Sequence, residues 1–137
     1  PYHAYDVTRQ LRPGENAIGA VLGDGWYAGY LAFTGRRRVY GGDPKLRAQL
    51  VVEYADGGRE TIGTDGTWRS ATGPILHADL LMGTAIDYRK EMPGWDAPGF
   101  ADGAWRPAAV TDAPGVAIEA HPGSAVRAQE VLKARTR

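Results

Sequence analysis

Glycine and proline recur at short intervals along the whole chain, and this spacing constrains the fold more than any other feature of the sequence. The 137 residues include 19 glycines and 9 prolines, scattered rather than pooled in one linker. The apolar runs between them are therefore short, and such runs separated by turn residues are typical of antiparallel strands in a sandwich or barrel. At a length that suits one domain, the sequence predicts a single all-β domain.

The clearest predicted strand is Leu46–Tyr54, in which apolar and polar side chains alternate. A period of two is what a half-buried antiparallel strand requires. Residues 55–58 follow as Ala-Asp-Gly-Gly, and these types tolerate the positive φ of hairpin turns. We therefore expect Arg59–Ile62 to return beside the strand. The apolar face consists of Leu46, Ala48, Leu50, Val52 and Tyr54.

Three further segments have weaker patterns. Ala17–Leu22 is continuously apolar, which predicts a strand buried on both faces. Thr84–Arg89 alternates weakly and is predicted to be another strand. Ala125–Arg137 has helical composition, but its pattern also fits an extended segment that leaves the domain.

The segment Pro93–Trp105 is too rich in proline and glycine for regular structure. We expect a long loop there, held down by the side chains of Trp95, Phe100 and Trp105.

Composition excludes several functions. Sixteen basic and sixteen acidic residues cancel, so nothing favours nucleic acid or an anionic membrane as a partner. The run Arg36–Arg38 is interpreted as a solvated loop. Without cysteine there are no disulfides, iron–sulfur clusters or thiolate nucleophiles. The compartment stays open between a bacterial cytoplasm and secretion, and no leader or membrane-spanning stretch is expected.

A series of short motifs carries a resemblance to a known family. They are Tyr5-Asp6-Val7-Thr8, Leu11–Asn16, Leu22–Tyr27, Tyr54–Gly57, Thr64-Asp65 with Trp68, Gly73-Pro74-Ile75, Asp87-Tyr88-Arg89, Gly94-Trp95-Asp96, and Asp102 with Trp105. In this order, over roughly residues 5–106, they resemble the N-terminal accessory domain of bacterial α-L-rhamnosidases. One departure is that Gly83 is followed by Thr84, where the family usually has glutamate.

The resemblance implies a jelly-roll β-sandwich of the galactose-binding-like type, which accompanies a separate (α/α)6-barrel catalytic domain. It also implies a sandwich domain over residues 1–122 that is incomplete at its start, since the family domain begins some tens of residues earlier. Residues 123–137 would be a strand and linker toward a following domain. We expect an exposed strand edge as a consequence, with a tendency to associate.

Catalysis by this chain alone is not expected. Glycoside hydrolysis needs two carboxylates held across the glycosidic bond, and nothing in the sequence pairs the candidate acids. Neither serine, Ser70 or Ser124, lies in a nucleophile elbow, and the three histidines are too dispersed for a zinc site. The chain is therefore predicted to be a fragment of a glycoside hydrolase. The candidate acids are Asp79, Asp87, Glu91, Asp96 and Asp102.

A sugar-binding site is predicted in the loop Leu22–Tyr30, LGDGWYAGY. Some domains of the resembled type bind L-rhamnose through calcium, and others are only structural. Asp24 is the first candidate for a calcium or hydroxyl ligand, Trp26 and Tyr27 are candidate stacking platforms, and the Pro74 backbone carbonyl is a candidate calcium ligand. Two functions stay open: a module that binds rhamnosides, or a structural domain that packs on the rest of the enzyme. Further candidates are Tyr40, Asp43 and Asp79.

Overall fold

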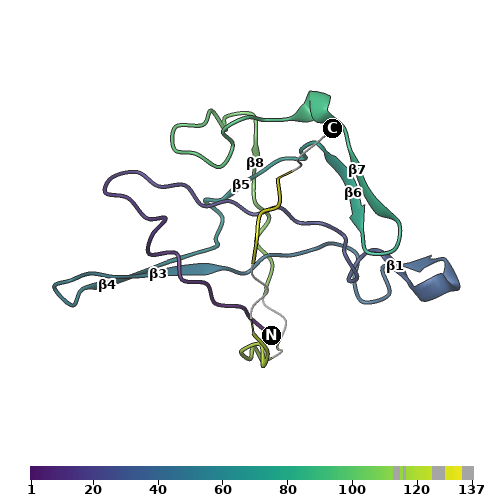
Figure 1. Cartoon of the computed structure of the whole chain (residues 1–137), viewed down its shortest axis with the longest axis horizontal. Coiled ribbons are helices and arrows are strands. Elements are labelled where there is room, and N and C mark those ends of the chain that lie inside the picture. Colours follow the sequence, from purple (N-terminus) through teal and green to yellow (C-terminus); the bar gives the residue numbers. More distant parts are fainter. Residues whose placement is uncertain (113–114, 116, 125–128, 134–137) are drawn as a thin grey trace. The chain divides into compact units, whose positions relative to one another are not determined.

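The structure, a computed structural model, describes residues 1–112, 115, 117–124 and 129–133. Its regular elements are short antiparallel strands and two single-turn 3-10 helices (Figure 1), so the predicted antiparallel all-β class is confirmed. The chain forms two compact units. One combines Pro1–Gly14 with the described residues from Thr111 onward, and the other is Glu15–Val110. Within this described part, no helix is long and apolar enough to cross a membrane.

Among its described residues, the first unit is closed by a parallel bridge between Tyr2 and Ala120. The Tyr2 amide donates a hydrogen bond to the Glu119 carbonyl at 2.7 Å, and the His121 amide donates to the Tyr2 carbonyl at 2.9 Å. The rings of His3 and His121 stack beside it, with centroids 4.5 Å apart. This bridge joins two stretches that are more than a hundred residues apart in the sequence.

The second unit contains four two-stranded antiparallel sheets, the pairs β1–β2, β3–β4, β5–β8 and β6–β7. Each strand has one partner among the residues that the structure describes, so the closure of these sheets into a jelly roll stays a prediction. The strands are β1 (Tyr30–Leu31), β2 (Arg36–Arg37), β3 (Gln49–Glu53), β4 (Arg59–Gly63), β5 (Arg69–Ser70), β6 (Ile75–Asp79), β7 (Gly83–Ile86) and β8 (Arg106–Pro107), and the 3-10 helices are η1 (Ala32–Thr34) and η2 (Tyr88–Lys90).

The predicted hairpin is confirmed as β3–β4, with Leu50 opposite Ile62 and Val52 opposite Glu60. Strand β3 is shorter than the alternating pattern, which begins three residues earlier, at Leu46. In the turn, the Asp56 carboxylate accepts the Gly58 amide at 2.8 Å. The residue between them, Gly57, has φ +87°, a conformation that side chains with a Cβ disfavour.

The other predicted strand, Thr84–Arg89, is confirmed only in its first half. Strand β7 ends at Ile86, and Asp87 then caps η2 by accepting the Arg89 amide. The Arg89 guanidinium also grips the Asp87 carboxylate through two hydrogen bonds, at 2.8 and 2.9 Å. The Asp-Tyr-Arg motif therefore ends the hairpin by a local, bidentate ion pair.

The loop Pro93–Trp105 has no strand or helix, as predicted. Its aromatic side chains pack on one another: the rings of Trp95 and Trp105 stack at 6.4 Å, and Phe100 meets Trp105 edge-on at 5.5 Å. Trp95 also lies flat against Gly19, where an added Cβ would overlap the indole ring.

The prediction of a buried strand at Ala17–Leu22 is wrong. This segment forms no strand, and its large side chains Ile18, Val21 and Leu22 are exposed. A continuous apolar run becomes a buried strand only where neighbouring strands flank it, and no described residue of this unit pairs with it. The predicted C-terminal helix or extended segment falls largely outside the described residues.

The turn of the β3–β4 hairpin gives a test of the fold. Gly57→Ala places a Cβ at positive φ, which we expect to lower the free energy of unfolding by about 1–2 kcal/mol. An added Cβ has no atom within 4 Å at Gly57 or at Gly42, and only Gly57 has positive φ. Gly42→Ala is therefore the matched control, expected within about 1 kcal/mol of the parent sequence. Urea unfolding measures both, and equal effects would contradict the assigned turn.

Candidate functional site

The loop LGDGWYAGY folds as a tight turn against the end of β6. The Ala28 amide donates to the Asp24 carbonyl at 3.0 Å, and the Gly25 amide donates to the Ala78 carbonyl at 2.9 Å. Gly25 turns the chain at φ +51° and forms a parallel bridge with Asp79. The glycines of this stretch thus allow the chain to turn sharply and to approach β6 closely.

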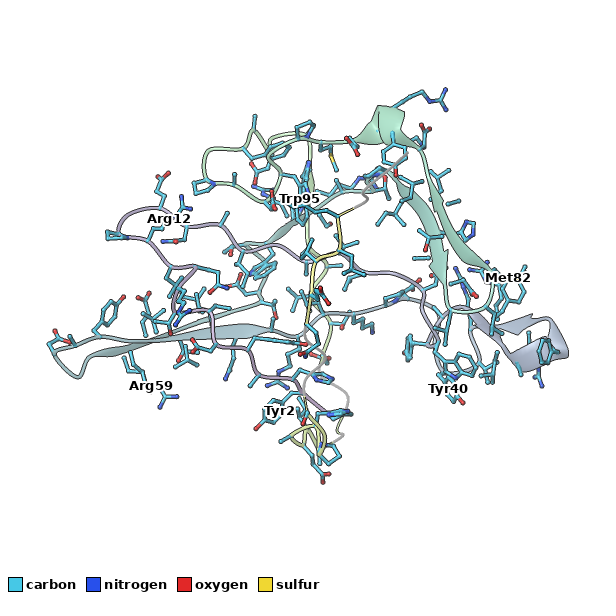
Figure 2. All side chains as sticks on the ribbon, in the orientation of Figure 1. Tyr2, Arg12, Tyr40, Arg59, Met82 and Trp95 are labelled. Carbon is cyan, nitrogen blue, oxygen red and sulfur yellow. The ribbon has the colours of Figure 1, made fainter. Side chains whose placement is uncertain are left out.

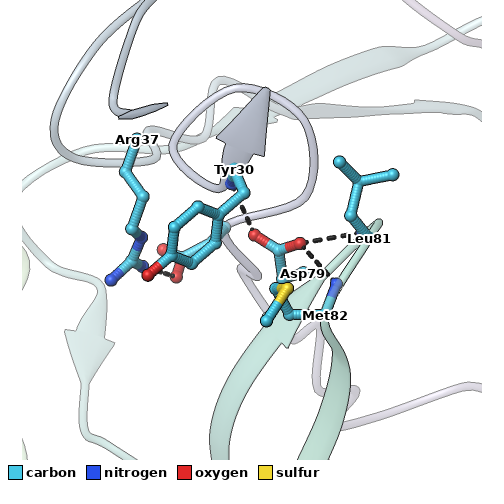
Figure 3. Close-up of polar contacts among 6 residues, drawn as sticks. Tyr30, Arg37, Asp79, Leu81 and Met82 are labelled. Carbon is cyan, nitrogen blue, oxygen red and sulfur yellow. Dashed lines mark hydrogen bonds and ion pairs between the residues drawn. The ribbon is translucent and has the colours of Figure 1, made fainter. Parts of the chain in front are cut away.

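Asp79 is the polar centre of this arrangement, and its side chain is only 8% exposed. One carboxylate oxygen, Oδ2, accepts the Tyr30 amide at 2.6 Å. The other, Oδ1, accepts the Leu81 and Met82 amides, both at 2.8 Å. Figure 3 shows the carboxylate between the start of β1 and the turn that follows β6. Asp79 thereby fixes two segments to each other.

Gly29 permits this close approach. A Cβ at this position would overlap both the Asp79 carboxylate and the Gly25 carbonyl oxygen. Its neighbour Ala28 is the one buried apolar side chain among the residues that the structure describes. Small residues at these two positions let the loop lie directly on the carboxylate.

The amide donors keep Asp79 ionised. The hydrogen bonds from the Met82 and Tyr30 amides lower the pKa of Asp79 below its ordinary value of 3.8, with smaller contributions from the Leu81 amide and the charge of Arg37. Burial of the carboxylate acts in the opposite direction, and the donors outweigh it.

The side chain of Asp24 faces Arg37 on β2, with 2.8 Å between its Oδ2 and the arginine Nη2. The same guanidinium lies over the Tyr30 ring, 5.2 Å from its centroid, which is the distance of a cation–π contact. Asp24, Arg37 and Tyr30 therefore form one cluster of an acidic side chain, a basic side chain and an aromatic ring. Figure 3 shows Arg37 beside the Tyr30 ring.

The predicted aromatic platforms lie on the surface. Trp26 and Tyr27 are both exposed because they occupy a turn, in which neighbouring side chains do not alternate as they do in a strand. Tyr27 packs its phenol ring closely against Gly41, and the following pair of candidates, Tyr40 and Asp43, is exposed as well. An open hollow of about 380 Å³ lies beside the loop, lined by Gly23, Gly25, Ala78, Asp79, Leu80 and Thr84.

Pro74 is not brought to this cluster. Its carbonyl accepts the Asp87 amide at 2.8 Å, at the end of the β6–β7 hairpin opposite Asp79. Four residues lie between Pro74 and Asp79, which places the two about 16 Å apart at the usual rise of a strand. The ligands of one calcium ion lie within about 2.6 Å of it. Within the described ranges, no group of three acidic, histidine or cysteine side chains could hold a metal ion. The calcium site of Asp24 and Pro74 stays a prediction.

Two members of the cluster were missed from the sequence. Arg37 belongs to the run interpreted as a solvated loop, and its pairing with Asp24 depends on β2 returning beside β1. Tyr30 has no sequence signal beyond its place at the end of the glycine-rich stretch. Asp79, a second-line candidate, proves to be a structural centre, because its oxygens already accept three amides.

The fold and the site together define an antiparallel all-β domain with open apolar strands, a class of domain that works as one part of a larger protein. The chain belongs to the family of the Alpha-L-rhamnosidase N-terminal domain, whose model matches residues 1–130. The resemblance seen in the motifs is therefore confirmed, while the predicted boundary at residue 122 stays a prediction.

Individual relatives agree with this assignment. The chain is 53% identical over 104 residues to an alpha-L-rhamnosidase of Streptomyces avermitilis, a match that covers 76% of this chain and 10% of the relative. It is 35% identical over 109 residues to an alpha-L-rhamnosidase of Formosa agariphila, covering 76% of this chain and 11% of the relative. The chain thus spans about a tenth of the length of these relatives and corresponds to one domain of such a glycoside hydrolase.

A solved structure also resembles it. The crystal structure of the Streptomyces avermitilis alpha-L-rhamnosidase complexed with L-rhamnose has 52% sequence identity to the chain and superposes with a TM-score of 0.59. The superposition covers 61% of this chain and 8% of that one.

The stability contributed by Asp79 should depend on pH in a defined direction. Because its pKa lies below 3.8 in the folded chain, the carboxylate stabilises the fold above that pH, and this stabilisation is lost as the pH falls through the folded pKa. We expect Asp79→Asn to lower the melting temperature at neutral pH, and the difference from the parent sequence to shrink below pH 3.8.

Thermal unfolding followed by circular dichroism measures this difference across the acid range. Asp96→Asn is the control, since that carboxylate is exposed in the aromatic loop and should leave the melting temperature unchanged. If the difference in melting temperature between Asp79→Asn and the parent sequence did not change with pH, Asp79 would not stabilise the fold as an ionised carboxylate.

Proposed function

We propose that this chain is a non-catalytic accessory domain of an α-L-rhamnosidase, whose apolar faces are covered by the rest of the parent polypeptide, including the (α/α)6 barrel that the resemblance implies. The observation that carries the proposal is the nearly missing core: of the described apolar side chains, only that of Ala28 is buried. A domain near this length ordinarily buries roughly two thirds of its unfolded surface.

Large apolar side chains are exposed to solvent on the β3–β4 and β6–β7 hairpins. On β3–β4 they include Ile62 and the neighbouring Tyr54, and on β6–β7 they include Leu76 and Ile86. Exposed apolar surface on this scale marks an interaction surface in a soluble protein. Since the chain spans about a tenth of its relatives, the rest of the parent polypeptide is the nearest candidate to cover it.

The acids of the domain support a non-catalytic role. Asp79 accepts three backbone amides, and Asp87 is held by a bidentate pair with Arg89. A catalytic carboxylate must face substrate with a free oxygen. These two acids are engaged in holding the fold.

Covered faces should be protected from chemical labelling. In this structure Tyr54, Ile62 and Leu76 are each about half exposed. We expect hydroxyl-radical labelling of the native parent polypeptide to modify them at far less than half the rate found after unfolding in urea, because packed surfaces exclude the reagent. Mass spectrometry of the digested protein measures both rates. Labelling of these residues at about half the unfolded rate would show that the apolar faces remain exposed in the parent polypeptide, and this would contradict the proposal.

A second candidate function is the binding of an L-rhamnose-type sugar with calcium. The observation in its favour is the cluster of Asp24, Arg37 and Tyr30 at a loop that also carries the exposed ring of Trp26. Sugars are held by an aromatic face together with charged side chains that bond their hydroxyls, and calcium can accept carboxylate and hydroxyl oxygens together. The crystal structure of the Streptomyces avermitilis alpha-L-rhamnosidase is a complex with L-rhamnose.

Calorimetric titration tests this second function. We expect heat on adding L-rhamnose in calcium-replete buffer, loss of that heat in Trp26→Ala, and loss of its calcium dependence in Asp24→Asn. Tyr54→Ala is the control, because that exposed aromatic lies on the β3–β4 hairpin, outside the cluster. Absence of heat at millimolar sugar with calcium present would reject the binding function and leave the structural one.

A further inference from the structure

The turn of the β6–β7 hairpin carries three consecutive large apolar side chains in solvent. Leu80, Leu81 and Met82 are 65%, 44% and 63% exposed, and Figure 2 labels Met82 at this turn. Hairpin turns are ordinarily built from glycine, asparagine, aspartate and serine. A run of three exposed apolar residues in such a place indicates a function. We call Leu80–Met82 the apolar tip.

The apolar tip is held in one conformation. The buried carboxylate of Asp79 accepts the amides of both Leu81 and Met82 at 2.8 Å, and Gly83 closes the turn at φ +78°. The same carboxylate is fixed from its other side by the Tyr30 amide. An interaction surface that is ordered before it binds loses less conformational entropy on binding. The backbone of the apolar tip is therefore ordered before a partner binds.

The position of the apolar tip limits what can cover it. The open faces of β6 and β7 could be covered by further strands of the same sandwich. A turn, however, lies at the end of its sheet, where the loops of a sandwich gather. Strands added to the sheet do not reach beyond that end. Loops of the same sandwich or a neighbouring domain can reach this end. The chain spans about a tenth of its relatives, so most of the polypeptide able to cover the turn belongs to other domains.

We propose that the apolar tip is the anchor by which this domain docks on a neighbouring domain of the parent polypeptide, in an uncharged apolar recess. The inference rests on the proposed structural function, and it identifies the apolar tip as the main contact between this domain and the rest of the parent polypeptide. The tip residues carry no charge, and the adjacent acid, Asp79, turns its carboxylate inward to the backbone amides. Methionine adapts to irregular recesses, and a few such desolvated side chains supply most of the energy of an interface.

Methionine oxidation in the parent polypeptide tests the anchor. This chain contains two methionines, exposed Met82 and half-buried Met92. We expect hydrogen peroxide to oxidise Met82 at least about tenfold more slowly in the native parent than in the urea-unfolded parent, as for a side chain sealed in a packed interface. Peptide mass spectrometry reports both sites in one experiment, with Met92 as the internal reference. Oxidation of Met82 near the unfolded rate overturns the proposal.

Two variants separate the apolar tip from the rest of the surface. Leu80→Asp puts a charge in the recess and should restore rapid oxidation of Met82, while Tyr54 and Ile62 stay protected from radical labelling. Val110→Asp is the matched control, since Val110 is an apolar residue of similar exposure that lies outside both hairpins, and it should leave Met82 protected. If Val110→Asp releases Met82 as well, or if Leu80→Asp does not, the apolar tip is not the anchor.

The outcomes also distinguish the two proposals. If Tyr54, Ile62 and Met82 all react as exposed residues, the structural function fails, and the anchor fails with it. If Tyr54 and Ile62 are protected and Met82 is reactive, only the anchor fails. Protection of Met82 that disappears on dilution would assign the apolar tip to a second copy of the protein and would overturn the proposal.

Discussion

The second unit depends on one buried carboxylate more than on any apolar contact. Asp79 accepts amides from Tyr30, Leu81 and Met82, and so joins the glycine-rich loop to the β6–β7 hairpin. Gly29 and Ala28 are small because the loop must reach that carboxylate. The placement of Asp24 opposite Arg37 follows, since both lie on the segment that Asp79 holds. Three charge-assisted hydrogen bonds thus organise a region in which little apolar surface is buried.

This arrangement suits a domain that completes its packing elsewhere. The two strands of each hairpin pair with each other, and local polar contacts such as the Asp87–Arg89 pair fix the hairpin ends. The apolar side chains of these hairpins are left for other surfaces. Polar contacts therefore set the shape of the loops, while burial of the open faces requires more polypeptide. The chain belongs to a family of N-terminal domains, which agrees with the need for further polypeptide to bury these faces.

The parts of the fold that depend on local sequence patterns were predicted correctly from the sequence. The alternation in Leu46–Tyr54 and the Asp-Gly turn identified the β3–β4 hairpin, and the three aromatics identified how the loop Pro93–Trp105 is held. The prediction failed at Ala17–Leu22, because burial of an apolar run depends on neighbouring strands that the run itself does not encode. The pairing of Asp24 with Arg37 was missed for a related reason: it follows from the return of one strand beside another. Asp79 was noticed only as a candidate acid and a possible ligand, since nothing local shows that its oxygens meet distant amides.

The separation of Tyr30 and Asp79 along the chain has a consequence for synthesis. The bond between them spans 49 residues, whereas the β3–β4 hairpin closes within a few. At the usual elongation rates of about 5–20 residues per second, the loop LGDGWYAGY is made roughly 2–10 s before the carboxylate that will hold it. The hairpin can form as it emerges from the ribosome. The loop can form its local bonds with β2 early. Its contact with β6 forms only after the second half of the unit has been translated.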